Sequence, residues 1–389
     1  MRSFLMAAGM VATLGAVAPA TAQDVAPLSA ALDATLEDFR ARYGFPGATA
    51  AIALPDGTVA AAAVGLADLE TGRAMSPETP MLAASIGKTF VAATVLALES
   101  EGRLSRADLL VDHLDDRPWF GDLPNAGSIT INHLLHHSSG LPDHVHLPAF
   151  QAAWPRMAGM EGAVNPDDLV GFVTGLEPLF EAGAGWAYSD TGYILLGLVI
   201  EEVTGQCYYE AVHLRFLAPL GLTDTFPSDR PDLPGLAVGY VTPDNPFGLP
   251  ERTADAGGRL LWNPAVEWAG GGLASTSRDL ALWGHLLFGG AAMAKPYLDR
   301  FLDGVPVDLD APGVLYGAGV AIYTETPRGP VYGHGGWIPA YVSSLRHYAD
   351  HGVTVAFQIN TDAGFLDDSS DLVPTLEAAL ADLAIEAVR

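Results

Sequence analysis

The sequence predicts an α+β protein in which an antiparallel sheet, covered by helices, is assembled from both ends of the chain. Two strand-like runs near the N-terminal end are joined by an Asp-Gly turn, which is typical of a β-hairpin. Further strand-like runs gather near the C-terminal end, before a last amphipathic pattern. Between them, helical patterns alternate with Pro- and Gly-rich loops, and strand-like alternation is nearly absent. A mainly helical lobe inserted between the two parts of the sheet accounts for this order.

The N-terminal part opens with a helix, a hairpin and a second helix. Apolar residues at helical spacing predict an amphipathic helix over 28–43. Strands are expected at 48–54 and 58–67, on either side of the Asp-Gly turn. A buried helix is expected to begin at Ser85 and to end near Gly102, because glycine suits the residue that follows a helix.

The middle of the chain, 105–264, is predicted to be the inserted helical lobe. Its helices are expected at 131–135, 166–174, 191–204 and 208–217. Beyond it we expect a helix at 277–287, strands at 317–323, 331–334, 340–347 and 353–360, and a closing helix at 372–388. The lobe with the sheet then consists of 23–104 and 265–389, and a substrate cleft is expected where the lobes meet.

The first 22 residues have the features of a secretory signal peptide. A positive residue, Arg2, precedes an apolar run that ends near Val17, and Ala20-Thr21-Ala22 forms an A-x-A cleavage site. The apolar run is shorter than the roughly 20 residues that span a bilayer, so we expect no stable membrane anchor. Cleavage after Ala22 leaves 367 residues (389 minus 22) and predicts a periplasmic or secreted protein.

The charge of the chain excludes two classes of partner. The formal net charge is −27, and it becomes −28 (18 minus 46) once the predicted leader and its single arginine are removed. Such a surface repels phosphate backbones and acidic lipids, so binding to nucleic acid or to an anionic membrane is not expected. The partner we expect is a small-molecule or short-peptide substrate, while the oligomeric state stays open. The single cysteine, Cys207, cannot form an internal disulfide.

Ser85 and Lys88 lie three residues apart at the start of a predicted helix. Residues i and i+3 of a helix share a face, so the amine lies beside the hydroxyl. An ammonium lowers the cost of forming an alkoxide, and a neutral amine can take the proton directly. Free N–H groups at the helix start can hold an oxyanion. The chain has only one other lysine, Lys295, although a surface lysine near an N-cap serine would give the same pattern.

Two further segments carry groups suited to the same chemistry. Tyr188 and Asp190 stand two residues apart in a loop before an apolar helix, so their side chains can face one cleft. A tyrosine beside an ammonium can relay protons, and the alternative is a capping motif with Asp190 or Thr191 at the N-cap. The third segment, His334-Gly335-Gly336, interrupts a strand pattern with glycines, as happens where a ligand approaches the backbone closely. A plain bulge or turn is the alternative there.

Taken together, 85–88, 188–190 and 334–336 form a much more specific pattern. In this order and at these separations they resemble the serine β-lactamase and penicillin-recognising DD-peptidase superfamily, in particular the branch with class C β-lactamases, D-amino-acid peptidases and related esterases. The resemblance extends over nearly all of the chain that follows the leader. Further matching stretches are 129–141, 219–225 and 271–280.

The resemblance implies an α+β fold of the β-lactamase and DD-peptidase type and a role for each site residue. Ser85 would be the acylated nucleophile, Lys88 its activator and Tyr188 the general base and acid. The strand that flanks the substrate would be His334-Gly335-Gly336, and the backbone N–H groups of Ser85 and Trp337 would form the oxyanion hole. The implied enzyme is a serine hydrolase that works through an acyl-enzyme on ester or D-amino-acid amide or peptide substrates, with no cofactor and no metal.

Two positions depart from the family pattern. Asp190 stands where the family has Asn, and an ionised carboxylate cannot donate a hydrogen bond to the acylamide carbonyl of a substrate. This favours simple esters or a substrate with a free amine. His334 replaces the lysine that is typical of β-lactamases, and a mostly neutral imidazole anchors a substrate carboxylate less well.

Three alternatives remain at this stage. A weak β-lactamase or a penicillin-binding DD-carboxypeptidase would use the same residues, and a non-catalytic binder of peptidoglycan fragments would resemble them without turnover. A metal hydrolase is a further alternative because five histidines gather in one stretch, although they lack a usual ligand spacing with a carboxylate base. These histidines are His133, His136, His137, His144 and His146.

Overall fold

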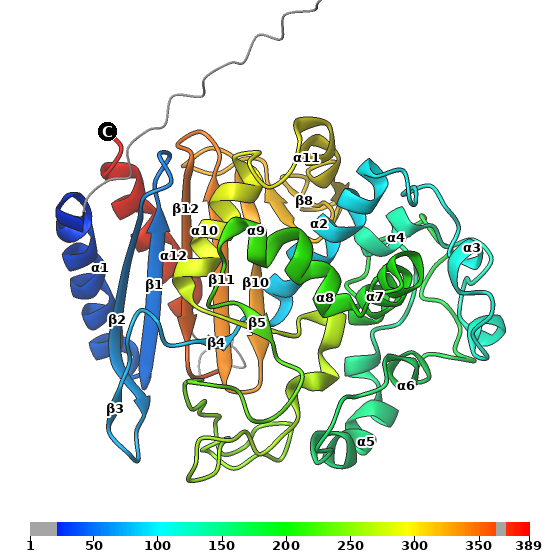
Figure 1. Ribbon diagram of the computed structural model, residues 1–389, viewed down its shortest axis with the longest axis horizontal. Helices are drawn as coiled ribbons and strands as arrows, with labels where there is room; N and C mark the ends of the chain where they lie inside the picture. Colours follow the sequence, from blue (N-terminus) through cyan, green and yellow to red (C-terminus); the bar gives the residue numbers. More distant parts are fainter. Residues whose placement is uncertain (1–21, 363–370) are drawn as a thin grey trace, which may run out of the picture.

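The computed structural model describes residues 22–362 and 371–389. The predicted leader therefore lies outside the described residues, except for Ala22, where the first helix begins. The main strands are β1 (Gly47–Ala53), β2 (Val59–Asp68), β3 (Arg73–Ala74), β7 (Val305–Pro306), β8 (Val314–Tyr316), β9 (Ala321–Tyr323), β10 (Val331–Ile338), β11 (Tyr341–Tyr348) and β12 (Val353–Ile359). They form one nine-stranded sheet in the order β3-β2-β1-β12-β11-β10-β9-β8-β7 (Figure 1).

The two ends of the chain meet at the centre of this sheet. Strand β1 pairs antiparallel with β12, so that Ala48 lies opposite Ile359, and with β2 on its other side. Every residue of β1 and β12 is buried, as expected for central strands that are covered on both faces. A second, small sheet has the order β4-β6-β5 and contains β4 (Met81–Leu82), β6 (Leu273–Ser275) and β5 (Phe226–Pro227).

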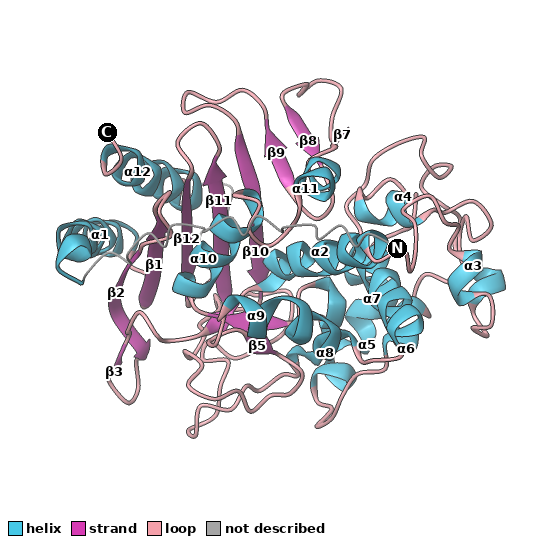
Figure 2. Ribbon diagram, turned by 45° about the horizontal axis from the view of Figure 1, so that its top comes forward, coloured by secondary structure: helices cyan, strands magenta, loops and turns pink. Residues whose placement is uncertain are grey.

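Helices cover both faces of the main sheet. They are α1 (Ala22–Tyr43), α2 (Gly87–Ser100), α3 (Val111–Leu114), α4 (Ile131–Leu135), α5 (Pro148–Ala158), α6 (Pro166–Val170), α7 (Asp190–Thr204), α8 (Tyr208–Val212), α9 (Ala218–Leu220), α10 (Ser277–Phe288), α11 (Lys295–Phe301) and α12 (Leu372–Glu386). Helices α1 and α12 pack side by side against one face, and α10 packs on the other (Figures 1 and 2). Within 22–362 and 371–389, no helix combines the length and the apolar character needed to cross a membrane.

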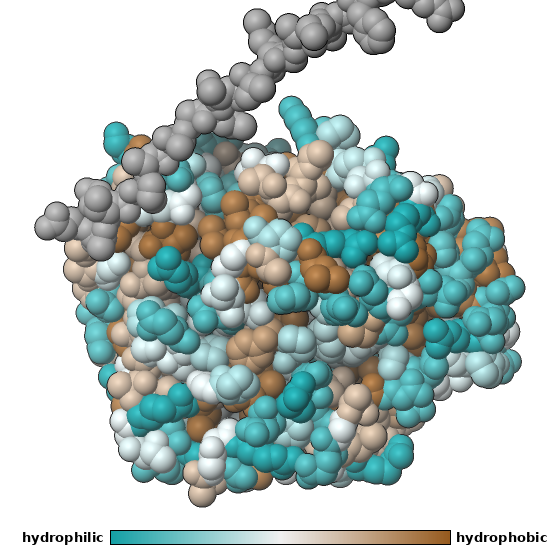
Figure 3. All heavy atoms as spheres, viewed as in Figure 1, coloured by the Kyte–Doolittle hydropathy of each residue, from teal (hydrophilic) through white to brown (hydrophobic). Residues whose placement is uncertain are grey.

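Leucines at helical spacing hold α1 and α12 to the sheet. Leu32 and Leu36 of α1 and Leu376 and Leu380 of α12 are fully buried in a core that they share with Phe357 of β12. Each such leucine contributes about 1.5–3 kcal/mol through the apolar surface that it removes from water. On the outside, hydrophilic residues cover much of the face shown in Figure 3, which agrees with the high net charge.

The helices from α3 to α8 lie to one side of the sheet, where Figure 1 shows them in cyan and green. The chain enters this region after α2 and returns through β6 and α10. Helix α7 is its centre, because ten consecutive residues from Thr191 to Ile200 are buried in it.

Three local features differ from the sequence prediction. The strand expected at 331–334 continues through its glycines to Ile338, so the segment is neither a bulge nor a turn. Strands β3 to β8, which have two or three residues each, and helices α3, α5, α9 and α11 were not predicted. The helix expected at 208–217 is interrupted, because its second half, His213–Leu217, is a π-helical turn. The other predicted elements that lie within the described residues are confirmed in type.

Candidate active site

Ser85 lies in a tight turn at the head of a buried helix. The turn, Ala84–Ile86, is a 3₁₀ helix that leads directly into α2, so the α-helix begins two residues later than predicted. Ala84 has a φ of 49°, a conformation that costs energy for any residue with a side chain. Gly271 packs against this turn so closely that a Cβ there would lie 2.6 Å from the Ala84 carbonyl carbon. The surrounding structure therefore holds this turn in a conformation that is strained at Ala84, directly before Ser85.

Lys88 is the centre of the polar network beside Ser85. Its side chain is fully buried, and Nζ donates to Ser85 Oγ at 3.0 Å, to the Asp190 carboxylate and to the Gly270 carbonyl. These three acceptors satisfy the three N–H bonds of an ammonium. Burial is the largest single influence and would lower the pKa of Lys88, but the charges and hydrogen bonds of Asp190 and Tyr188 together outweigh it and raise this pKa above its usual value. The amine is therefore protonated at neutral pH.

Tyr188 completes the contacts of the Ser85 hydroxyl. Its phenol oxygen lies 2.9 Å from Ser85 Oγ, and its ring centroid lies 4.9 Å from Lys88 Nζ. Burial raises the pKa of Tyr188, although the charge of Lys88 opposes this. The phenol is therefore neutral in the free protein, and the structure brings Ser85, Lys88 and Tyr188 together as the sequence predicted.

Asp190 does not act as a helix cap. It is the first residue of α7, and Ser189 precedes it as the N-cap residue, with no capping hydrogen bond from its side chain. The capping alternative with Asp190 or Thr191 at the N-cap is therefore wrong. The Asp190 carboxylate instead forms an ion pair with Lys88.

His334, Gly335 and Gly336 lie on β10, which passes beside the Ser85 turn. A Cβ on Gly336 would lie 2.3 Å from the Ala83 carbonyl oxygen, so only glycine lets the strand approach so closely. His334 Nε2 lies 2.9 Å from the Tyr316 hydroxyl, and Nδ1 lies 2.5 Å from the Gly335 carbonyl. Burial lowers the pKa of His334 to about 3, so the ring is neutral. Both ring nitrogens are thus engaged within the protein.

His137 is a site residue for which the sequence offered only the metal alternative. Its ring lies against Tyr188, with 4.2 Å between ring centroids, and its Nδ1 accepts a hydrogen bond of 3.2 Å from the Ser189 N–H. Burial, followed by the charge of Lys88, holds the pKa of His137 well below its usual value. Its φ of 56° is unusual for a residue other than glycine. The matching stretch 129–141 was the signal that could have identified it.

The five histidines do not form a metal centre in the described part of the chain. No group of three or more His, Cys, Asp or Glu side chains there is arranged to hold a metal ion. His133 belongs to the capping box of α4 with Thr130, and His144 Nδ1 lies 3.0 Å from the Thr191 hydroxyl.

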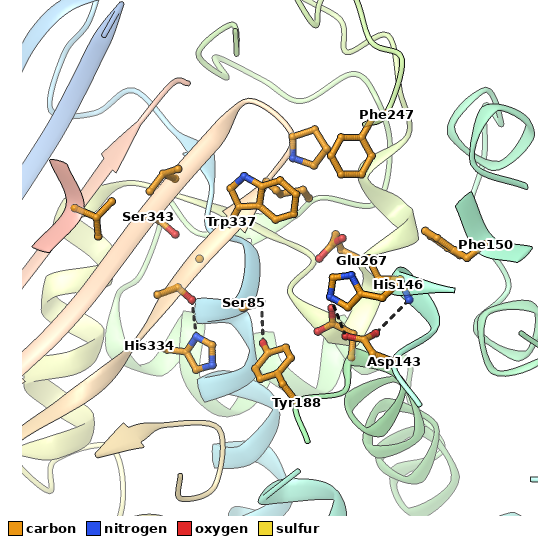
Figure 4. A pocket seen from close by; sticks show the side chains of 18 of the residues that line it. Ser85, Asp143, His146, Phe150, Tyr188, Phe247, Glu267, His334, Trp337 and Ser343 are labelled. Carbon is orange, nitrogen blue, oxygen red and sulfur yellow. Dashed lines mark hydrogen bonds and ion pairs between the residues drawn. The ribbon is translucent and has the colours of Figure 1, made fainter. Parts of the chain in front are cut away.

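A cavity of about 380 Å³ opens beside Ser85 (Figure 4). Tyr188, Asp190 and the whole of 334–337 line it, so Trp337 also lies where the sequence predicted. Lining residues that sequence reasoning missed are Asp143, Phe150, Trp154, Phe247, Glu267 and Arg346. They come from loops, from helix α5 and from strand β11, which are distant in sequence, and no local motif marks them. Figure 4 shows His334 on one side of Ser85 and Asp143, His146 and Glu267 on the other.

Known proteins with similar sequences or structures indicate which family this chain belongs to. Over 305 residues the chain is 28% identical to penicillin-binding protein 4* of Bacillus subtilis (strain 168), covering 77% of this chain and 64% of that protein. Over 228 residues it is 33% identical to esterase EstB of Burkholderia gladioli, covering 54% of each. The chain thus spans less than two thirds of the length of these two relatives. A crystal structure of a D-stereospecific amidohydrolase from Streptomyces sp. matches with a TM-score of 0.75 and 28% identity, covering 92% of this chain and 98% of that one.

The model of the Beta-lactamase family matches residues 32–380, which is most of the chain. The nine-stranded antiparallel sheet with its covering helices is the α+β fold that the sequence predicted. Sequence match, fold and structural similarity agree that the chain belongs to the Beta-lactamase family.

Proposed function

We propose that this member of the family is a secreted or periplasmic serine hydrolase that forms an acyl-enzyme at Ser85. The observation that carries the proposal is that Ser85 Oγ lies 3.0 Å from Lys88 Nζ and 2.9 Å from the Tyr188 hydroxyl, at the edge of the cavity. A serine hydroxyl is a weak nucleophile unless neighbouring groups activate it. The proposed location rests on the predicted leader.

The protonation states define what each neighbour contributes. The Lys88 ammonium stabilises negative charge that develops on Ser85 Oγ, since a nearby positive charge favours the anion. Tyr188 is neutral, and a hydroxyl can accept one proton while it donates another. In the proposed acylation, the bond from Ser85 Oγ to the substrate carbonyl carbon forms, the bond to the leaving group breaks, and the serine proton reaches the leaving group through Tyr188. The backbone N–H groups of Ser85 and Trp337 are proposed to hold the oxyanion.

The proposed substrates are esters or D-amino-acid amides and peptides. The names of the esterase and of the D-stereospecific amidohydrolase support this class. Two features of the site agree with it. Asp190, ionised and paired with Lys88, cannot donate to an acylamide carbonyl, and the neutral His334 offers no positive charge to a substrate carboxylate.

Intact-mass spectrometry during turnover of a p-nitrophenyl ester, and separately with a penicillin, tests the nucleophile. We expect an acyl adduct on the wild type and a rate lower by roughly 10³-fold or more in Ser85→Ala, because no other group can take the acyl chain. Ser100→Ala, an exposed serine at the end of the same helix, is the matched control and should keep the wild-type rate.

An adduct that persists in Ser85→Ala would refute the assignment. A penicillin adduct that forms on Ser85 without ester turnover would favour the penicillin-binding alternative instead. Absence of both adduct and turnover in the wild type would favour the non-catalytic binder.

A further inference from the structure

The peptide groups on both sides of Tyr188 donate hydrogen bonds to one residue, His137. The Ala187 N–H donates to the His137 carbonyl at 3.0 Å, and the Ser189 N–H donates to His137 Nδ1 at 3.2 Å. Between these two bonds, the Tyr188 phenol points toward Ser85 Oγ, which lies 2.9 Å away (Figure 4). The rings of His137 and Tyr188 lie against each other, with 4.2 Å between their centroids. His137 thus holds the segment that carries the phenol through its backbone and through its ring.

The backbone at position 137 has a conformation that glycine adopts most easily. The His137 N–H donates to the Leu134 carbonyl at 3.3 Å. The next N–H, that of Ser138, donates to the His133 carbonyl at 2.9 Å. These two bonds form a Schellman motif at the end of α4, and His137, with a φ of 56°, occupies its left-handed position, where glycine is usual. A side chain is therefore present at 137 against the local preference of the backbone.

The imidazole ring of His137 has a second cost. Because Nδ1 accepts the Ser189 N–H, it carries no proton, and the proton of a neutral imidazole then lies on Nε2. Nε2 is buried and has no hydrogen-bond partner among residues 22–362 and 371–389. A buried N–H without a partner costs free energy. Glycine or an apolar side chain would avoid this cost, but neither could accept the Ser189 N–H.

Other hydrogen bonds between the two segments begin only after Tyr188. Ser189 Oγ and Thr191 Oγ1 both donate to the Pro142 carbonyl, at 3.1 and 3.0 Å. Thr191 Oγ1 also accepts the His144 N–H at 3.0 Å. These bonds fix the start of α7, whereas the N–H groups before and after Tyr188 are bound by His137.

We propose that His137 is a positioning residue that keeps the Tyr188 phenol within hydrogen-bond distance of the Ser85 hydroxyl. The inference rests on the proposed acylation of Ser85 and adds to it a residue that does not line the cavity. Proton transfer needs heavy atoms roughly 2.6–3.2 Å apart, and a displacement of about 1 Å can lower a rate by about 100-fold. The 2.9 Å between the two hydroxyls therefore leaves little room for movement of this segment.

Two variants separate the hydrogen bond from the conformation of the backbone. Glycine and asparagine are both accepted at the left-handed position, and only asparagine has a side-chain oxygen that can accept the Ser189 N–H. Stopped-flow release of p-nitrophenol from p-nitrophenyl butyrate gives the maximal acylation rate constant and the ester concentration that half-saturates it. In His137→Gly the rate constant should fall roughly 10- to 100-fold at an unchanged half-saturating concentration, because Tyr188 is displaced while the cavity is intact. His137→Asn should stay within about fivefold of the wild type, because the acceptor remains.

A double-mutant cycle measures whether His137 acts through Tyr188. In the Tyr188→Phe background, His137→Gly should change the rate constant by less than about twofold, since residues that act as a unit are not additive. A purely structural role would give the same factor in both backgrounds, and the rate constants of the variants would follow their urea midpoints. The matched control is His136→Asn, at the neighbouring histidine, whose ring nitrogens have no hydrogen-bond partner in the described part of the molecule. It should keep the wild-type rate constant.

Equal rate constants for His137→Gly and His137→Asn, or equal factors in the two backgrounds, would overturn the inference. If His137→Gly does not fold, His137→Gln replaces it in both experiments, because its amide oxygen lies one bond farther out and no longer coincides with Nδ1. It should then show the loss expected for glycine, and a rate constant equal to that of His137→Asn would overturn the inference. Absence of Ser85-dependent ester turnover in the wild type would instead count against the proposed function.

Discussion

At the scale of single residues, the protonation state of Lys88 depends chiefly on the charge of Asp190, to which Tyr188 adds. Burial by itself disfavours the ammonium, and Asp190, together with Tyr188, reverses this preference. The amide that the family carries at this position accepts a hydrogen bond from lysine but supplies no charge. Asp190 therefore fixes Lys88 in the form that stabilises an alkoxide and not in the form that takes a proton.

Asp190→Asn tests this dependence through pH. Once the carboxylate is gone, burial dominates and the pKa of Lys88 falls, so the ammonium is lost at lower pH. Because the ammonium is the active form in our proposal, the alkaline limb of kcat/KM should move down by about one pH unit or more. The profile is measured with a p-nitroanilide, which is stable in alkali. Asp382→Asn, which breaks the ion pair with Arg328 far from the cavity, should leave the limb in place. An unmoved limb in Asp190→Asn would contradict the assignment.

At the scale of elements, strand β10 and the Ser85 turn are held against each other by glycines. Gly336 allows the strand to pass the Ala83 carbonyl, and the Ser343 hydroxyl of β11 donates to the same carbonyl at 2.8 Å. Gly271 gives the opposite side of the turn the same close packing. The position of the nucleophile thus depends on backbone contacts more than on side-chain interdigitation.

Gly336→Ala should reduce the stability of the protein. The new Cβ would lie 2.2 Å from Ser343 Oγ and 2.3 Å from the Ala83 carbonyl oxygen, which forces the strand and the turn apart. We expect a loss of about 1–3 kcal/mol in the free energy of unfolding, as for other overpacked positions. The matched control is Gly335→Ala, whose Cβ would have no protein atom closer than 3.8 Å. Chemical denaturation of both variants measures the difference, and equal midpoints would refute the packing argument.

Some features of the fold and of the site could be predicted from the sequence, and others could not. Elements with a strong local pattern, such as the β1–β2 hairpin and α7, were predicted because their apolar spacing is repeated over many residues. Ser85, Lys88 and Tyr188 were found because their spacing matches a known motif. Glu267 and Asp143 were not, since each is an isolated carboxyl in a loop and only the folded chain brings them to one cavity. The continuation of β10 was missed because the reason for its glycines is a contact with a distant segment.

At the scale of the whole molecule, buried imidazoles make folding sensitive to acid. Burial lowers the pKa to about 4 for His136, His144 and His347 and to about 3 for His334. Between pH 6.5 and these values the unfolded chain binds more protons than the folded one, so stability is lost as the pH falls. The raised pKa values of Asp143, Glu267, Asp279 and Asp362 act in the opposite direction, but, among the described residues, these four carboxyls oppose seven imidazoles whose pKa is lowered.

His136→Leu should make the protein less sensitive to acid. Neither ring nitrogen of His136 has a hydrogen-bond partner in the described part of the molecule, so its removal leaves no partner unpaired. We expect the loss of unfolding free energy between pH 6.5 and 4 to shrink by up to roughly 3 kcal/mol. Urea titrations across this pH range measure it. His213→Leu, at an exposed position, should leave the slope unchanged, and an unchanged slope in His136→Leu would show that this ring does not control acid stability.

The pairing of β1 with β12 has a consequence for the order of events during synthesis. On the ribosome, the first hairpin emerges long before Ile359, the residue that lies opposite Ala48. A nascent chain therefore carries a hairpin in which β1 pairs with β2 but has no partner along its other edge until almost all of the protein has been made. The glycine contact that seats β10 beside Ser85 also forms only once the chain has been made as far as β10, Val331–Ile338. A truncated product consequently has no assembled nucleophile, and an export pathway that carries unfolded chains would deliver the protein before it can act.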